Sequence, residues 1–287
     1  MIKTLDFYAI TLKNLMLYSK RIIAGMLCTV MLCAGVSAQD IVTYNIISTT
    51  GKIVDKKTGK TLNVGDKIIL QTELQFNSLY DRAVVLSPSH TRHFLELPKT
   101  SFVNSQLTVT SDQALTPIKS RPKLVTGIRG SATLRNSGVG PQTLKDYFGN
   151  DTFTIIGPEL ALPVAHQDAA KFELLLRYEN GGRVEEYVAT GMTISKKGLK
   201  LQGTGIAECY VILKENGQNT PVTQTSLFFI EKKQLFVEFD SLLNALNINK
   251  KKDDKNKTSD VLRQYCDDVY GTIDDATLEK TITEYLK

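Results

Sequence analysis

Short runs that alternate apolar and polar residues dominate the chain from Asp40 to about Asp240, and this period of two predicts β-strands. Glycine, aspartate and proline separate the runs, and no amphipathic helix intervenes in the first block. The first runs occupy residues 42–47, 51–54, 67–74, 83–86 and 94–97. Short strands at this spacing predict a small β-barrel over residues 39–100.

Prolines and glycines interrupt residues 101–150, which have little apolar periodicity. We expect a connecting region with a short strand at 123–126 and a short helix at 142–148 that Gly149 ends. The glycine-rich run 136–140 lacks the preceding strand and the long following helix of a phosphate-binding turn. It is interpreted as a loop, and no cofactor is expected.

Residues 151–246 form a second strand-rich block. Its expected strands are 171–178, 183–188, 207–213, 225–230 and 235–239. Asn180-Gly181-Gly182 and Asn216-Gly217 lie between paired runs, and such residues tolerate the positive φ of tight hairpin turns. About seven short strands over this length predict an immunoglobulin-like β-sandwich, although the chain has no tryptophan for the usual core signature. The whole fold is therefore expected to be mainly β.

Residues 247–257 are mostly charged and predict a solvated linker. Ser259 then caps a helix that Gly271 ends, and Asp274 caps a second helix. The chain is thus expected to end in a helical hairpin over residues 258–287.

Each helix of this hairpin has an apolar face, and each is too short to be stable alone in water. The faces are formed by Val261, Leu262, Tyr265, Leu278, Ile282 and Tyr285. We expect a semi-independent appendage that docks on a partner or on a second copy of the chain. Docking on the chain's own β-body is the alternative, and a Cys209–Cys266 disulfide would favour it.

The N-terminus resembles a secretory signal peptide over residues 1–38. Lys20 and Arg21 precede an apolar run at 22–33, and Val36-Ser37-Ala38 provides small residues for cleavage. The run is too short to span a membrane, so we expect no membrane span after cleavage. The mature chain would begin at Gln39, in the periplasm or outside the cell.

Two further features refine this expectation. Met16 would give a signal peptide of ordinary length and is an alternative start. Cys28 and Cys33 each follow leucine, whereas a lipid-modified cysteine needs a small residue directly before it. We therefore expect no lipid anchor.

The basic charge of the chain lies largely in the signal peptide. Residues 1–38 hold four of the 35 basic residues and one of the 30 acidic residues, so the remainder has a net charge of +2. A nucleic-acid partner would require a concentrated basic surface, and none is expected.

Candidate chemistry along the chain is sparse. His90 and His93 would point to opposite faces of a strand, and His166 is the third histidine, so no metal site is expected. Cys209 lies in an apolar run, where a thiol is usually buried and inert. Asp240-Ser241-Leu242 resembles a short O-glycosylation motif of some gram-negative envelopes, or caps a helix.

One partial resemblance covers residues 51–97. Gly51 is followed by Leu62-Asn63-Val64-Gly65-Asp66 and later by Ala83-Val84-Val85-Leu86, a pattern similar to SH3-like or FecR-like periplasmic β-modules. In that family Gly-Asp opens a tight turn before a central strand. The family's later Asp-Gly hairpin is replaced here by Ser87-Pro88-Ser89-His90. The resemblance implies a sensing or binding module, and the whole chain resembles multi-domain bacterial envelope proteins.

These features favour a secreted or periplasmic binding protein of the cell envelope without enzymatic activity. Its partner would be a protein or an envelope polymer, and a homo-oligomer stays open. One alternative is a hydrolase of envelope polymers that uses paired carboxylates, with Glu185/Glu186 or Asp81/Glu96 as candidates. The other alternative is a carbohydrate-binding module. Its candidate tyrosines are Tyr178, Tyr187 and Tyr210.

Overall fold

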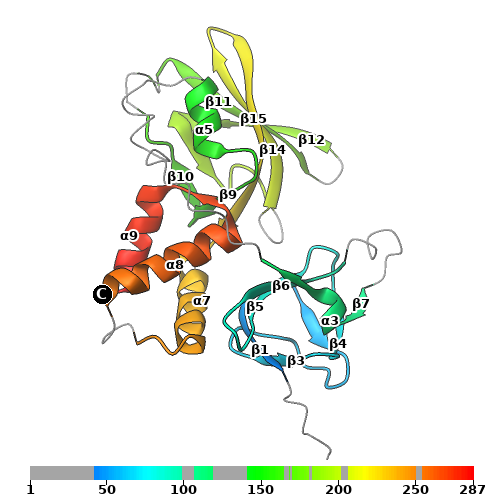
Figure 1. Cartoon of the computed structure of the whole chain (residues 1–287). Helices are drawn as coiled ribbons and strands as arrows, with labels where there is room; N and C mark the ends of the chain where they lie inside the picture. The colour runs from blue at the N-terminus through cyan, green and yellow to red at the C-terminus, as the bar shows by residue number, and fades with distance from the viewer. Residues whose placement is uncertain are drawn as a thin grey trace, which may run out of the picture. The chain divides into compact units, whose positions relative to one another are not determined.

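A computed structural model describes residues 42–98, 107–118, 141–164, 168, 170–180, 183–201, 206–249 and 254–287. The described chain is mainly β, and its longest helices lie near the C-terminus (Figure 1). The expected signal peptide (1–38), the expected strand at 123–126, the glycine-rich run 136–140 and His166 lie outside the described residues. No helix among the described residues is long and apolar enough to cross a membrane.

The first block forms two antiparallel sheets around one apolar core. The five-stranded sheet has the order β3-β1-β5-β6-β8, and the three-stranded sheet has the order β2-β4-β7. The elements are β1 (Thr43–Thr50), β2 (Ile53–Asp55), β3 (Lys67–Ile69), β4 (Glu73–Phe76), β5 (Arg82–Leu86), β6 (Arg92–Glu96), β7 (Thr108–Thr110), α3 (Ser111–Ala114) and β8 (Leu115–Pro117). Side chains of both sheets, including Ile46, Leu74 and Leu95, share the core.

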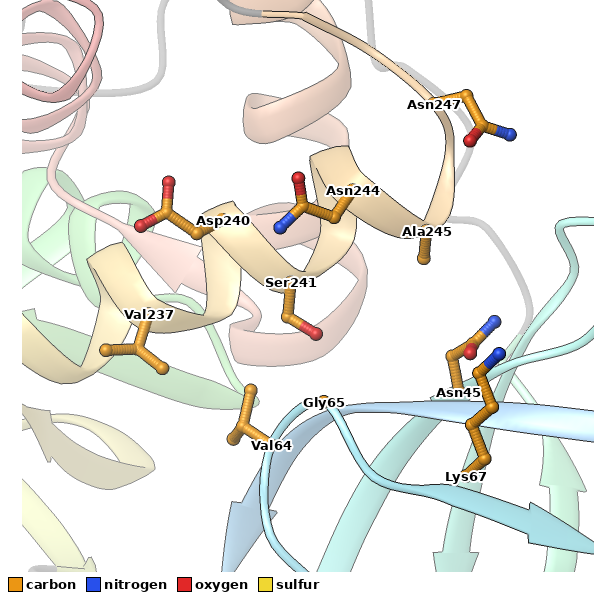
Figure 2. Close-up of a pocket in the computed structure, with 10 residues that line it drawn as sticks. All are labelled: Asn45, Val64, Gly65, Lys67, Val237, Asp240, Ser241, Asn244, Ala245 and Asn247. Carbon is orange, nitrogen blue, oxygen red and sulfur yellow. The ribbon is translucent and has the colours of Figure 1, made fainter.

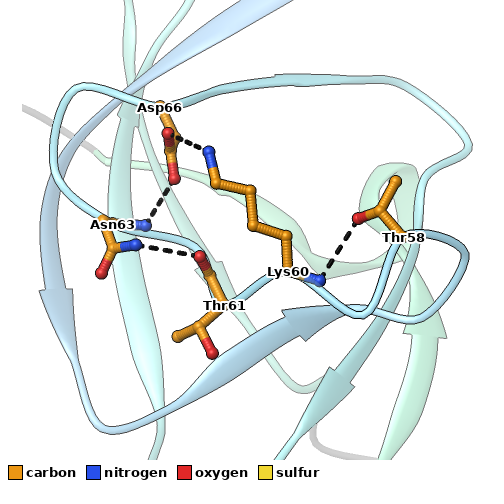
Figure 3. A network of polar contacts seen from close by, with 5 residues as sticks. All are labelled: Thr58, Lys60, Thr61, Asn63 and Asp66. Atoms are coloured by element: carbon orange, nitrogen blue, oxygen red, sulfur yellow. Dashed lines mark hydrogen bonds and ion pairs between the residues drawn. The ribbon is translucent and has the colours of Figure 1, made fainter.

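The turn before β3 is held by Asp66 (Figure 3). Its Oδ1 atom accepts a hydrogen bond from Lys60 Nζ at 2.6 Å, and its Oδ2 atom accepts one from the Asn63 backbone N–H at 2.9 Å. The hydrogen bond from Lys60 holds the pKa of Asp66 below its ordinary value. Gly65 has φ +88°, which favours glycine. The Gly-Asp pair thus forms the tight turn expected before this strand.

The second block contains a six-stranded sheet with the order β12-β11-β14-β15-β9-β16, and β10 and β13 form a separate pair. The elements are α5 (Pro141–Phe148), β9 (Thr152–Ile156), β10 (Glu159–Ala161), β11 (Phe172–Asn180), β12 (Arg183–Ala189), η1 (Thr190–Met192), β13 (Thr193–Ser195), β14 (Ile206–Glu215), β15 (Gln218–Ile230) and β16 (Thr272–Ile273). The two hairpins expected from the sequence are present as β11–β12 and β14–β15. Asn216 and Gly217 turn the second one with φ +50° and +81°.

The immunoglobulin-like sandwich expected from the sequence is not confirmed. Strand β9 runs parallel to β15, and β16 runs parallel to β9, so the large sheet is mixed. Residues 235–239 are not a strand but belong to helix α7 (Lys232–Ala245). Leu235 and Phe239 also fit helical spacing with Leu242 and Leu243, and this longer period determines the structure.

Two further helices follow, α8 (Lys255–Tyr270) and α9 (Asp275–Tyr285). Helix α8 begins earlier than expected, because the Asp254 carboxylate accepts from the Asn256 N–H and caps it. The expected linker at 247–257 is therefore partly helical. Gly271 ends α8 with φ +75°, and Asp274 caps α9, both as expected.

The apolar faces of these helices are covered by the chain itself, which corrects the expected free docking face. Leu262, Tyr265, Leu278, Ile282 and Tyr285 are buried, and Val261 is half-buried. They share one apolar cluster with side chains of α7 and of both large sheets, including Phe239, Val84 and Phe228. Residues 42–287 form one compact unit. The C-terminal helices are therefore part of the body and not an appendage.

Candidate functional site

A groove of about 570 Å³ lies between α7 and the turn before β3 (Figure 2). Most of the described residues that line it are polar. They are Asn45, Val64, Gly65, Lys67, Val237, Asp240, Ser241, Asn244, Ala245 and Asn247. Three segments far apart in the sequence thus supply the lining.

One backbone carbonyl connects the two walls of the groove. The Ile46 carbonyl oxygen accepts from the Gly65 N–H at 2.8 Å and from Ser241 Oγ at 3.2 Å. Val237, Ser241 and Ala245 are spaced by four residues and form one stripe along α7, which Figure 2 shows on the side of the turn. These side chains are small or medium in size, so helix and turn can approach closely.

Strands β1 and β3 supply the rest of the floor. Asn45 and Lys67 lie directly opposite each other in the strand register, and Figure 2 shows both side chains extending toward α7. Asn244 and Asn247 add two exposed amides at the end of the helix. Side-chain amides donate and accept, while the lysine ammonium group donates only. The groove therefore presents a dense mixture of hydrogen-bonding groups.

The groove lacks the elements of nucleophilic catalysis among its described lining. Its carboxylate belongs to Asp240, whose Oδ1 atom accepts from the Tyr285 hydroxyl at 2.6 Å. Burial and this hydrogen bond raise the pKa of Tyr285. The Ser241 hydroxyl is engaged with a backbone carbonyl, and no imidazole is present in the lining to take its proton. Ser241 is therefore not placed for acyl transfer in this lining.

The position of Ser241 bears on the O-glycosylation motif proposed for residues 240–242. Asp240-Ser241-Leu242 lies inside α7, so Asp240 does not cap a helix there. The Ser241 side chain is half-buried, and its hydroxyl donates into the groove wall. This environment does not present the hydroxyl as an exposed acceptor.

The other side of α7 carries a buried carboxylate. Glu238 is 0% exposed. Its Oε1 atom accepts from Ser48 Oγ at 2.8 Å and from Gln234 Nε2 at 3.2 Å. Its Oε2 atom accepts from the hydroxyl of Tyr265 at 3.0 Å and from that of Tyr270. The carboxylate thus joins β1, α7 and α8.

Burial raises the pKa of Glu238 above its ordinary value of 4.5, and the four hydrogen bonds oppose part of this shift. Burial likewise raises the pKa of Tyr265 and of Tyr270 well above 10. With no exposure, this group is placed to hold elements together and not to meet a ligand.

A second buried contact joins the first block to the C-terminal helices. Arg92 Nη2 of β6 lies 2.6 Å from Asp268 Oδ2 of α8, and the Asp268 side chain is 0% exposed. Gln264 Nε2 donates to the other carboxylate oxygen at 2.9 Å. Such a pair disfavours alternative placements of the helix, because separating it leaves a buried charge.

The two cysteines do not form the disulfide that was considered as a possibility. Cys209 and Cys266 are both buried and free, and they lie in different apolar clusters. Burial raises the pKa of Cys209 to about 12 and that of Cys266 well above its ordinary value. Neither thiol is therefore an activated nucleophile.

His90 and His93 lie in different environments. His90 adopts φ +62° in the turn after β5, whereas His93 lies on β6 and packs edge-to-face against Tyr44, with ring centroids 5.7 Å apart. Within the described ranges, no group of three or more His, Cys, Asp or Glu side chains could hold a metal ion.

Three of the four carboxylates that the hydrolase alternative named make contacts within their own sheet or turn. Glu186 pairs with Arg177 across the sheet, while Glu185 accepts from Asn180 Nδ2, and neighbouring strand residues face opposite sides. The Oδ2 atom of buried Asp81 accepts from the Asn77 and Ser78 N–H groups and so closes a turn. Asp81 is thus occupied by local structure.

The three candidate tyrosines have different environments. The hydroxyl of buried Tyr178 donates to the Leu199 carbonyl at 2.8 Å, and that of half-buried Tyr187 donates to the Thr193 carbonyl at 3.0 Å. Tyr210 is 53% exposed on β14. Of the three, Tyr210 alone is placed to meet a ligand.

Sequence reasoning missed the groove, because its lining comes from three distant segments and because residues 235–239 were expected to be a strand. The available signal was the set of polar residues at Asp240, Asn244 and Asn247 beside an apolar stripe at helical spacing. Comparison with known proteins finds no family model, no curated protein and no solved structure that matches the chain.

Proposed function

We propose that this protein is an exported, non-catalytic binding protein of the cell envelope, and that it binds an envelope polymer in the groove between α7 and β1–β3. The observation that carries the proposal is the lining. Asn45, Lys67, Asn244 and Asn247 offer many donors and acceptors, while the described lining holds no nucleophile–base pair. Such a surface fits a chain rich in amides and hydroxyl groups.

The test is binding to isolated cell-wall polymer, measured by co-sedimentation, and to its soluble fragments, measured by calorimetry. The double variant Lys67→Ala/Asn244→Ala should weaken binding about tenfold or more, since it removes hydrogen bonds to a charged and a polar group. The matched control is Lys233→Ala/Asn219→Ala, which changes the same residue types at exposed positions outside the groove.

Equal binding by the groove variant and the wild type would refute the groove assignment. Release of soluble products from the polymer, retained after repurification, would instead support the hydrolase alternative.

Export of the protein has its own test. Protein recovered from envelope and culture fractions should begin at Gln39, and recovery of the intact N-terminus from the cytoplasm would contradict export.

A further inference from the structure

The face of the large sheet that points away from its apolar core carries an exposed tyrosine. On β14, Cys209 and Val211 point into the core, while Glu208 and Tyr210 point outward and are exposed. In the strand register Tyr210 lies between Arg177 of β11 and Gln224 of β15. The ring therefore stands among long polar side chains on a fixed sheet.

A polar pocket of about 590 Å³ is lined by two neighbours of Tyr210, which are Glu208 on the same strand and Gln224 opposite it on β15. Its described lining comes from β9, β14, β15 and the residues just before β9. The residues are Asn150, Asp151, Thr152, Glu208, Gln224, Thr225 and Ser226. In the strand register, Glu208 of β14 lies opposite Ser226 of β15, and Ser226 lies opposite Thr152 of β9. These polar residues thus form one row across three strands. Carboxylate, amide and hydroxyl groups are thus ordered beside one aromatic ring.

The charges indicate what kind of ligand fits. Glu208 presents an exposed carboxylate to the pocket, which disfavours phosphates, sulfates and uronic acids. The ligand should therefore be uncharged or cationic and rich in hydroxyl groups.

We propose that this surface binds a neutral saccharide. One sugar ring packs its C–H face against the ring of Tyr210, and the hydroxyl groups of the neighbouring unit hydrogen-bond Gln224 and Glu208. Residues two apart on a strand face the same side, about 7 Å from each other, so Tyr210 and Glu208 can contact successive parts of one oligosaccharide. The site is separate from the α7 groove and does not depend on the function proposed for it.

The test is titration of the full chain with maltotriose, cellotriose and chitotriose, with binding measured by calorimetry. At least one trisaccharide should bind. Tyr210→Ala should weaken that binding about tenfold, because an aromatic packing contact and its buried area contribute roughly 1.4 kcal/mol, whereas Tyr210→Phe should stay within about threefold. Tyr80→Ala, at another exposed tyrosine outside this sheet, is the matched control and should bind as the wild type does.

Two results separate this site from the groove. The groove variant Lys67→Ala/Asn244→Ala should keep its trisaccharide affinity, and Gln224→Ala should lose part of it. Absence of binding by all three trisaccharides up to about 10 mM, which corresponds to an affinity weaker than roughly −3 kcal/mol, overturns the proposal. Wild-type binding by Tyr210→Ala, or loss of binding in the groove variant alone, overturns it as well.

Discussion

Glu238 should make the stability of this protein fall as the pH rises above the acidic range. Burial raises the pKa of this carboxyl in the folded state, while in the unfolded chain it stays near 4.5. A raised pKa means that the stabilisation is fully present below pH 4.5 and is lost as the pH rises through the folded-state pKa. Each unit of pKa difference corresponds to about 1.4 kcal/mol in the free energy of unfolding.

The perturbation is Glu238→Gln, which keeps the shape and removes the titration. Free energies of unfolding from urea titrations between pH 4 and pH 9 give the measurement. Relative to the variant, the free energy of unfolding of the wild type should fall by up to about 1.4 kcal/mol per pH unit above pH 4.5. The difference should level off above the folded-state pKa. The control is Glu173→Gln, at an exposed ion pair with Lys214, where the effect should stay below about 1 kcal/mol at each pH. Parallel pH curves for wild type and Glu238→Gln would refute the reasoning.

Three other outcomes follow from the buried contacts. Arg92→Ala should lower the free energy of unfolding by about 3–5 kcal/mol in urea titrations, because it removes the guanidinium group that pairs with the buried Asp268 carboxylate. A loss under about 1 kcal/mol would contradict this. In protein that begins at Gln39, and so lacks Cys28 and Cys33, Cys209 and Cys266 should resist a thiol reagent at pH 8 while folded and react once urea unfolds the chain. Rapid labelling of this native protein would show that one of them is accessible. Deletion of residues 250–287 should abolish the cooperative thermal transition, because the large apolar cluster loses helices α8 and α9. An unchanged melting temperature would restore the idea of an appendage.

Local signals in the sequence determined many elements correctly. Asn216-Gly217 formed its tight turn because both residues adopt positive φ at low cost, and the β14–β15 hairpin followed from this turn and from the alternating patterns beside it. Gly271 and Asp274 ended and began helices for equally local reasons. Gly65-Asp66 formed its turn through contacts within six residues. The mainly β character of the chain was evident for the same reason.

Features that depend on distant partners could not be predicted. Residues 235–239 fit both a strand and a helix, and the apolar surface offered by α8 and both large sheets decided for the helix. The parallel pairing of β9 with β15 joins segments about 70 residues apart, and no short pattern specifies it. The groove beside α7 and the Glu238 contacts exist because β1 meets a helix some 190 residues later in the chain.

The C-terminal helices show the same division. Their apolar faces were evident from residue spacing alone, since amphipathic period is a local property. The sequence did not show which surface covers those faces, because an apolar face with Leu262, Tyr265 and Ile282 can pack on a partner as well as on the chain's own body. Sequence by itself determined that the surface must be buried. The tertiary structure decided which side chains bury it, namely Phe239 and the sheet residues of the same apolar cluster. The Arg92–Asp268 ion pair favours this placement of the helices.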